Sequence, residues 1–226
     1  MNYTNLKRLF DLGRPIVEDS HNPYLHLAYK YSKKNYKVIT TGEIYVKGKE
    51  LNIPDYIYAF MSYHNEALMI ANIIGGKVIS IVFRSLDANK EFIKIGTTRA
   101  TFYGLGELSD NFKYGDPILL VEGHLDRDVM AEIYPNTLGI MTNHLSKVQV
   151  EILKYLTNKF ILMLDNDDAG KDGLKTAKHQ LYGNKVVELK HDPYLKDAGD
   201  LMKLDLEDHR KYLRVVEDYK FQIQLF

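Results

Sequence analysis

Short apolar runs alternate with helical segments over residues 118–189, and this alternation predicts a mainly parallel sheet. Four runs have the length and aliphatic content of buried strands: 118–121, 137–141, 160–164 and 185–189. The segments between them place apolar side chains at helical spacing: 125–133, 145–156 and 170–181. Strand–helix–strand units of this size join parallel strands through crossover helices. A last helical pattern covers residues 206–221.

The first part of the chain has a different pattern, which predicts an antiparallel and mixed subdomain. Asn22 and Pro23 are typical of a helix start, and apolar positions continue to residue 34. Runs rich in β-branched and aromatic residues follow, and we interpret them as strands: 36–40, 43–46, 56–62, 68–74 and 77–86. Gly75 and Gly76 join the last two runs, which predicts a tight hairpin.

Together the two patterns predict an α/β protein with a mainly parallel sheet flanked by helices, preceded by a smaller α+β subdomain. The pattern changes at the turn-rich residues 114–117. We therefore expect an N-terminal subdomain over 1–115, a catalytic domain over 116–205 and a helical tail over 206–226. The length of 226 residues suits one large domain or two small ones.

Composition excludes several classes of protein. Hydrophobic residues make up 45% and charged residues 27% of the chain, which is typical of globular proteins and not of disordered or collagen-like ones. No apolar run approaches the roughly 18 residues of a membrane span, and the N-terminus has no secretion signal. We therefore expect a cytoplasmic protein without a membrane partner.

The chain contains no cysteine, which excludes disulfides, thiol catalysis and thiolate zinc sites. Its eight histidines show no paired ligand spacing, so we expect no zinc. Net charge is zero, but residues 1–115 have an excess of Lys and Arg and residues 116–226 an excess of Asp and Glu. Such a division fits a basic half that meets polyanions and an acidic half that holds metal, and it also arises by chance.

Carboxylates follow two of the predicted parallel strands. Glu122 and Asp126 come after the run 118–121, and Asp165 and Asp167 come after the run 160–164. One such loop alone is more often a solvated turn with an acidic helix cap. Two of them at the carboxyl edge of one sheet, each with a glycine beside it, favour a shared cation site. Hard cations such as Mg²⁺ prefer oxygen ligands of this kind.

These loops resemble the motifs of the TOPRIM domain of primases, topoisomerases and related enzymes. The closer resemblance is to DnaG-type primases of bacteria and phages, whose two acidic motifs are similar to residues 122–126 and 165–171. A later acidic motif of that family resembles residues 196–201. Upstream, Arg84, Lys94 and the Tyr-Gly-Leu at 103–105 resemble a series found in primases. The resemblance covers roughly residues 22–205 and is strongest over 118–171.

The resemblance implies the catalytic core of a DNA primase, a nucleotidyltransferase that makes short RNA primers on single-stranded DNA from NTPs during replication. It implies catalytic roles for Glu122, Asp165 and Asp167, which with Asp197 and Asp200 would hold Mg²⁺ or Mn²⁺. The residues that it implies on the substrate side are Arg84, Lys94, Arg99, Asp126 and Lys171.

The family's zinc-binding module has no counterpart in this sequence. We therefore expect template choice to need a partner, such as a helicase, a single-strand-binding protein or a separate zinc-bearing subunit. A compact core of this kind suggests a phage or a mobile element. Two other functions stay open: a TOPRIM nuclease that uses the same carboxylates, and a non-catalytic nucleic-acid-binding accessory protein of replication.

Overall fold

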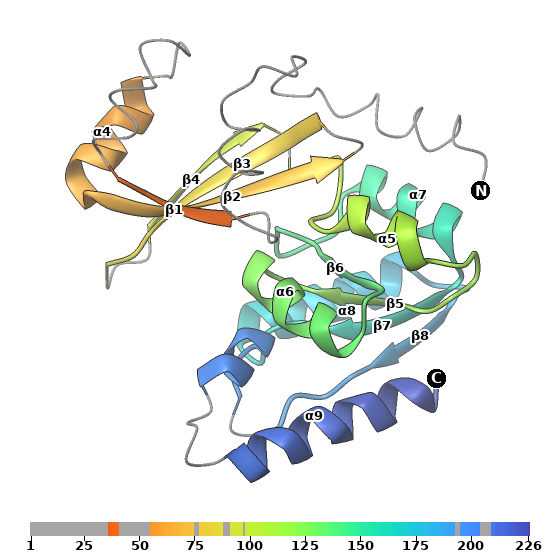
Figure 1. The fold of residues 1–226 in the computed structure, drawn as a ribbon. Helices are drawn as coiled ribbons and strands as arrows, with labels where there is room; N and C mark the ends of the chain where they lie inside the picture. The colour runs from red at the N-terminus through yellow and green to blue at the C-terminus, as the bar shows by residue number, and fades with distance from the viewer. Residues whose placement is uncertain are drawn as a thin grey trace. The chain divides into compact units, whose positions relative to one another are not determined.

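The computed structural model describes residues 36–40, 55–74, 77–87, 91–96, 98–192, 195–203 and 209–226. These residues fall into two compact units, one ending at residue 96 and the other beginning at residue 98. Each unit is built on one four-stranded sheet (Figure 1). The predicted helix at 23–34 and the predicted strand at 43–46 lie outside the described residues. None of the described helices has the length and apolar character needed to span a membrane.

The first unit is an antiparallel sheet with the strand order β1-β2-β3-β4. Its strands are β1 (Tyr36–Thr40), β2 (Glu66–Ile74), β3 (Lys77–Ser85) and β4 (Phe92–Gly96). Ile74 pairs with Lys77, which confirms the hairpin predicted from the two glycines between them. The runs rich in β-branched and aromatic residues thus predicted β1, β2 and β3, whereas β4 was not among the predicted strands.

One prediction for this unit is wrong: residues 56–62 belong to helix α4 (Asp55–His64) and not to a strand. Ile57 and Met61 are fully buried and Phe60 is partly buried, which is the spacing of a helix face that packs on a sheet. The aromatic content of the segment suggested a strand, but such preferences depend on packing and are readily overridden.

Helix α4 covers one face of the antiparallel sheet. The core formed with it comprises side chains that alternate along β2 and β3: Ala67, Met69, Ala71, Ile81 and Phe83. Arg84 pairs with Leu68 and Phe92, and Lys94 pairs with Val82. Because paired residues point to the same side of a sheet, Arg84 and Lys94 share the face opposite to α4.

The second unit contains a fully parallel sheet with the strand order β6-β5-β7-β8, which confirms the predicted α/β class. Its strands are β5 (Ile118–Val121), β6 (Thr137–Gly139), β7 (Lys159–Met163) and β8 (Lys185–Glu188). The crossover helices are α6 (His124–Ile133), α7 (Lys147–Leu156) and α8 (Asp168–Gln180). Right-handed crossovers in this order put α6 on one face of the sheet and α7 and α8 on the other (Figure 1).

Three further elements complete this unit: α5 (Leu105–Asn111), the 3₁₀-helix η1 (Ala198–Lys203) and α9 (His209–Gln224). Side chains from η1 and α9 pack with α6 on the same face of the sheet, among them Leu201, Tyr219 and Ile223. Residues 98–111 also belong here, since Tyr103 forms a bridge with Gly139 at the end of β6. The functional division expected at residues 115 and 116 stays a prediction.

Candidate functional site

The two acidic loops lie at the carboxyl ends of β5 and β7, which are neighbours in the parallel sheet. From β5 the chain continues through α6 to β6 on one side, and from β7 it continues through α8 to β8 on the other. The loops therefore diverge toward opposite faces of the sheet. The crevice at such a switch of direction is where open α/β sheets bind ligands.

Glu122 is the first residue after β5, and its side chain is partly buried. Burial raises the pKa of the Glu122 carboxyl, and the negative charges of Asp167 and Asp126 raise it further. A hydrogen bond from the backbone N–H of Asp165 acts in the opposite direction. That hydrogen bond joins the two acidic loops directly.

Asp165 follows β7 after one further buried residue, Leu164. Burial, followed by the charges of nearby carboxylates, raises the pKa of Asp165 to about 7. The carboxylates concerned are Glu122, Asp126, Asp197 and Asp167. Carboxylates of all three acidic motifs therefore act on Asp165.

Gly170 allows the Asp165 loop to lie against the start of α8. A Cβ atom at Gly170 would lie 2.0 Å from the backbone oxygen of Asp165, so only glycine fits this close approach. The glycine of the second motif thus has a steric role in shaping the loop that carries the carboxylates.

Asp167 lies only two residues from Asp165 but in a different environment. It is the N-cap of α8, and its Oδ1 accepts a hydrogen bond of 2.9 Å from the backbone N–H of Gly170. Its Oδ2 lies 3.2 Å from Nζ of Lys196. The Gly170 hydrogen bond and Lys196 lower the pKa of Asp167, so this carboxylate stays charged while Asp165 tends toward neutrality.

Asp126 is more deeply placed and has a connecting role. Its two oxygens accept hydrogen bonds from the backbone N–H groups of Gly123, at 2.9 Å, and Gly199, at 2.8 Å. Burial, and next the charge of Asp197, raise the pKa of Asp126. The side chain therefore fastens the third acidic motif to the loop after β5.

The third motif forms a tight turn at the start of η1. Oδ1 of Asp197 accepts a hydrogen bond from the backbone N–H of Asp200, at 2.9 Å. Oδ2 of Asp200 accepts one from the backbone N–H of Lys196, also at 2.9 Å. The turn brings Asp197 close enough to Asp165 to contribute to its raised pKa.

The donors of this site fit a hard divalent cation. They are all carboxylate oxygens, which Mg²⁺ and Mn²⁺ prefer, and their mutual repulsion is what a bound cation relieves. Within the described part of the chain, no three acidic or histidine side chains already converge as a closed ligand group. The arrangement is thus an open cluster, suited to a cation that keeps several waters or shares its ligands with a substrate.

The candidate substrate-side cations lie in two separate places. Arg84 is half-buried and Lys94 exposed on the antiparallel sheet, where Nζ of Lys94 lies 5.1 Å from the centre of the Phe92 ring. Arg99 and Lys171 are exposed in the second unit, and Nζ of Lys171 lies 3.9 Å from Oδ1 of Asp168. The structure thus brings the carboxylates together within one unit and leaves Arg84 and Lys94 on the other.

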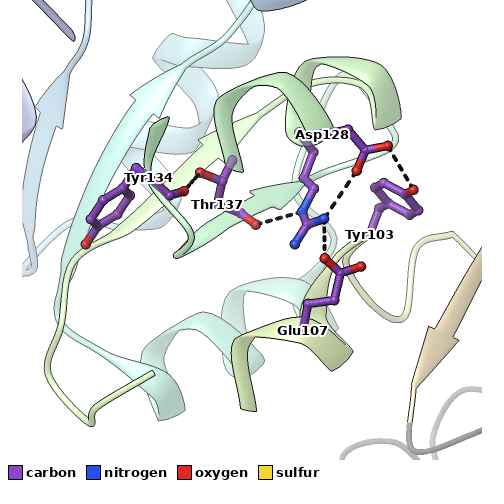
Figure 2. A network of polar contacts seen from close by, with 6 residues as sticks. Tyr103, Glu107, Asp128, Tyr134 and Thr137 are labelled. Atoms are coloured by element: carbon purple, nitrogen blue, oxygen red, sulfur yellow. Dashed lines mark hydrogen bonds and ion pairs between the residues drawn. The ribbon is translucent and has the colours of Figure 1, made fainter. Parts of the chain in front are cut away.

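A buried polar network that the sequence analysis did not predict involves the helix that follows the first motif (Figure 2). Arg127 is buried in α6, forms ion pairs with Glu107 and Asp128, and donates from Nε to the backbone oxygen of Thr137. The hydroxyl of Tyr103 donates to Asp128 over 3.2 Å. These contacts fix the Tyr-Gly-Leu segment and α5 against the helix that begins at the first motif.

Gly104 is part of the same arrangement. It has a φ of 84°, and a Cβ atom there would lie 2.2 Å from Nε of Arg127. The ring of Tyr103 also lies edge-on to His124, with 4.9 Å between ring centres. In the sequence, the signal for this network is Arg127, an arginine within the helical pattern that follows the first motif. Most of its partners are distant in sequence and cannot be predicted from residue spacing.

A second buried network fixes the backbone beside Arg99. Ser146 caps α7, and its hydroxyl donates to the backbone oxygen of Arg99. The fully buried Gln149 donates from Nε2 to the backbone oxygens of Thr101, at 2.7 Å, and Ile140, at 3.0 Å. The Ser-x-x-Gln spacing predicts the cap, whereas the attachment to residues 99–101 is visible only in the structure.

Comparison with known proteins identifies related sequences. Residues 119–202 match the model of a Toprim-like domain family. An uncharacterized protein of Mycoplasma genitalium, MG010, is 30% identical over 189 residues, which cover 77% of this chain and 76% of that protein.

The fold is similar to solved DNA primase structures. The zinc-binding and RNA polymerase domains of the Aquifex aeolicus primase match with a TM-score of 0.59 and 20% identity, over 94% of this chain and 60% of that one. A primase domain from Pseudomonas aeruginosa matches with a TM-score of 0.53 and 19% identity, over 66% and 50%. The primase fragment of the bacteriophage T7 primase-helicase matches with a TM-score of 0.50 and 21% identity, over 66% and 62%. This chain thus spans between half and about three fifths of these solved chains.

Proposed function

Since the chain belongs to the same family as MG010 of Mycoplasma genitalium and contains a Toprim-like domain in a fold like that of DnaG-type primase cores, we propose that it is a primase. The reaction is metal-dependent, template-directed synthesis of short RNA primers on single-stranded DNA. The protein would thus be a nucleotidyltransferase of DNA replication.

One observation carries this proposal: the carboxylates after β5 and β7 meet at the switch point of the parallel sheet, where burial and neighbouring negative charges raise the pKa of Glu122 and of Asp165. Solvated turns that only cap helices would have no reason to converge in this way. Carboxylates that repel one another lower the stability of the folded protein, and such a cost is typical of functional sites.

Glu122, Asp165 and Asp167, with Asp197 beside them, are the residues that would hold Mg²⁺ or Mn²⁺, and Asp200 would support this set by shaping the turn. A divalent cation bound there would neutralise charge on the triphosphate and lower the pKa of a coordinated hydroxyl. The two acidic loops would bind the nucleotide at the carboxyl edge of the parallel sheet, between the loop that leads to α6 and the loop that leads to α8.

In the proposed reaction the 3′-hydroxyl oxygen of one nucleotide forms a bond to the α-phosphorus of the next. The bond from that phosphorus to the bridging oxygen breaks, and pyrophosphate leaves with the electron pair. Glu122, the first residue after β5, would either hold the metal or accept the hydroxyl proton at its carboxylate.

The other candidate residues would bind and orient the substrates. Arg84 and Lys94 are proposed to contact phosphates of template or nucleotide from the face of the antiparallel sheet opposite to α4, and Arg99 and Lys171 are proposed to contact phosphates from the second unit. Asp126 would affect substrate binding indirectly, because its hydrogen bonds to Gly123 and Gly199 hold the two loops in position.

The extent of the fold supports a primase over a TOPRIM nuclease. The likeness to the Aquifex aeolicus primase covers 94% of this chain, which includes the antiparallel sheet as well as the Toprim-like domain. We propose single-stranded DNA and NTPs as substrates. A replicative helicase or a separate zinc-bearing subunit would be the partner that selects the template.

A primer-synthesis assay tests the proposal. The purified protein is incubated with single-stranded templates of varied sequence, labelled NTPs and Mg²⁺ or Mn²⁺, with and without a candidate helicase. We expect short RNA ladders that disappear for Asp167→Asn. Shortening of the template would indicate a nuclease instead, and template binding without either product would indicate an accessory protein.

A further inference from the structure

Lys196 occupies a fixed position among the carboxylates, although it is not itself one of the acidic residues of the third motif. Its backbone oxygen accepts a hydrogen bond of 2.7 Å from the backbone N–H of Asn166, between Asp165 and Asp167. Its backbone N–H donates to Asp200 over 2.9 Å. Both backbone groups of Lys196 are therefore held by the acidic loops themselves.

The side chain of Lys196 reaches back to the second motif. Its ammonium lies 3.2 Å from Oδ2 of Asp167. The other oxygen of Asp167 accepts the Gly170 N–H, and a metal that used the oxygen facing Lys196 would have to displace the ammonium. A lysine ammonium at this oxygen supplies one positive charge where a divalent cation would supply two.

We propose that Lys196 is a place-holding cation: it neutralises Asp167 in the metal-free protein, is displaced when the divalent cation binds, and then contacts the phosphates of the nucleotide. The inference rests on the proposed function, because it takes Asp167 as a metal ligand and an NTP as the substrate. It assigns to Lys196 a role in the order of binding that the acidic motifs alone do not suggest.

The exposure of the two partners permits this exchange. The Lys196 side chain is 62% exposed and that of Asp167 is 40% exposed, so the ion pair lies in solvent and can open. An exposed ion pair contributes little to stability, and a divalent cation competes with it readily. Once released, the flexible four-carbon side chain of a lysine can reach a phosphate within several ångströms of its backbone.

The chain offers a matched control for this pair. Lys178 lies in the last turn of α8, and its Nζ is 2.7 Å from Oε2 of Glu188. It is a lysine–carboxylate pair of the same type, on the helix that Asp167 caps but about ten residues farther along. The change Lys178→Met removes the same charge without touching the acidic loops.

The first measurement is Mn²⁺ binding, followed by the electron paramagnetic resonance signal of the free ion at fixed ionic strength. The wild type is compared with Lys196→Met, Lys196→Arg and Lys178→Met. We expect Lys196→Met to bind Mn²⁺ about 3- to 5-fold more tightly, as loss of an exposed competing ion pair allows. Lys196→Arg and Lys178→Met should bind as the wild type does.

The second measurement is binding of α,β-methylene-ATP, which cannot react at its α–β bridge, at saturating Mn²⁺. We expect Lys196→Met to weaken this binding about 10-fold and Lys196→Arg to retain most of it. A merely structural role for Lys196 would not tighten metal binding while weakening nucleotide binding.

Unchanged Mn²⁺ affinity in Lys196→Met would overturn the place-holding role, and unchanged nucleotide affinity would overturn the contact with phosphate. Both results are independent of primer synthesis. If the wild type binds Mn²⁺ and nucleotide but makes no primers, the proposed function fails while the inference about Lys196 is still decided. If no variant binds Mn²⁺, both proposals fail.

Discussion

The two sheets of this protein present charge in different ways. On the antiparallel sheet, Arg84 and Lys94 project from the strands themselves, and their positions follow from strand register. On the parallel sheet the strands are buried, and the charged groups lie in the loops at their carboxyl ends. Of these two cations Lys94 is exposed and Arg84 half-buried, whereas the carboxylates gathered at the switch point are coupled to one another.

This difference predicts separate effects for the two regions. Substitutions in the carboxylate cluster should alter catalysis, metal binding and the pH dependence of stability. The effects of two such substitutions should not be additive. Changes on the antiparallel sheet should alter template affinity and its salt dependence by small, additive amounts.

The largest effect is expected for Asp167→Asn, which should reduce primer synthesis by at least about 100-fold. A carboxamide is a poor ligand for Mg²⁺, but asparagine caps a helix as well as aspartate does, so the fold should be intact. Synthesis rate and melting temperature are measured together. Asp168→Asn, at an exposed position one residue later, is the control and should be as active as the wild type. Near-normal synthesis by Asp167→Asn would show that the metal assignment is wrong.

Gly170→Ala should lower the melting temperature by about 4–8 °C, because the added Cβ would meet the Asp165 backbone at 2.0 Å. Helix propensity alone predicts the opposite, since alanine is favoured over glycine by about 1 kcal/mol in a helix. Thermal unfolding of this variant and of Lys175→Ala, an exposed change in the same helix, decides between the two. A higher melting temperature for Gly170→Ala would contradict the steric role.

Asp165→Asn should stabilise the metal-free protein. Because the pKa of Asp165 is raised to about 7 in the folded state, ionisation of this carboxyl lowers the free energy of unfolding. The stability that the neutral carboxyl contributes is fully present below about pH 4 and is lost as pH rises through 7. With solvent screening, the gain above pH 7 should be about 1 kcal/mol, or ~2–4 °C in melting temperature.

A pH series of melting temperatures without metal measures this effect. The advantage of Asp165→Asn over the wild type should grow from near zero at pH 4 to its maximum above pH 7. Asp167→Asn serves as the comparison, since the pKa of Asp167 is lowered and its charged form is stabilised, so its removal should bring no gain. An Asp165→Asn advantage that does not change with pH would show that the charges are not coupled.

The smallest effect is expected for Lys94→Ala, which removes one phosphate contact. The slope of log affinity against log salt should become shallower by about 0.7 for single-stranded DNA. Affinity is measured across a salt series beside Asp165→Asn and Lys154→Ala, an exposed lysine of α7. Arg84→Ala should add a similar change. Loss of template affinity in Asp165→Asn but not in Lys94→Ala would refute the division between the two sheets.

Much of the fold follows from local pattern. The strands at 118–121 and 36–40 have the predicted bounds, and the ends of α6, α7 and α8 lie within two residues of those predicted. Buried parallel strands are continuous apolar runs, and crossover helices are amphipathic, so short windows of sequence carry their signal. The carboxylates after β5 and β7 were located for the same reason, since the end of a strand is also a local feature.

Helix α4 shows where local pattern was insufficient. Residues 56–62 contain the aromatic and β-branched side chains of a strand as well as the spacing of a helix, and contact with the antiparallel sheet selected the helix. Composition predicted a strand there, whereas the spacing of apolar residues fits a helix. The helix forms because it buries Ile57 and Met61 on the same side, against the sheet.

The chemical groups that this protein brings to its sheets can be identified from the sequence: oxygen ligands after two parallel strands, cations on antiparallel strands, and no thiol. How those groups meet depends on the three-dimensional fold. Asp165 and Asp167 are two residues apart in one motif, yet their pKa values shift in opposite directions. Burial, with the charges of Glu122 and Asp126 from a distant segment, raises the pKa of Asp165, whereas the Gly170 N–H and the distant Lys196 lower that of Asp167. Electrostatic effects depend on distance and burial in three dimensions, and neither is encoded in the spacing of residues along the chain.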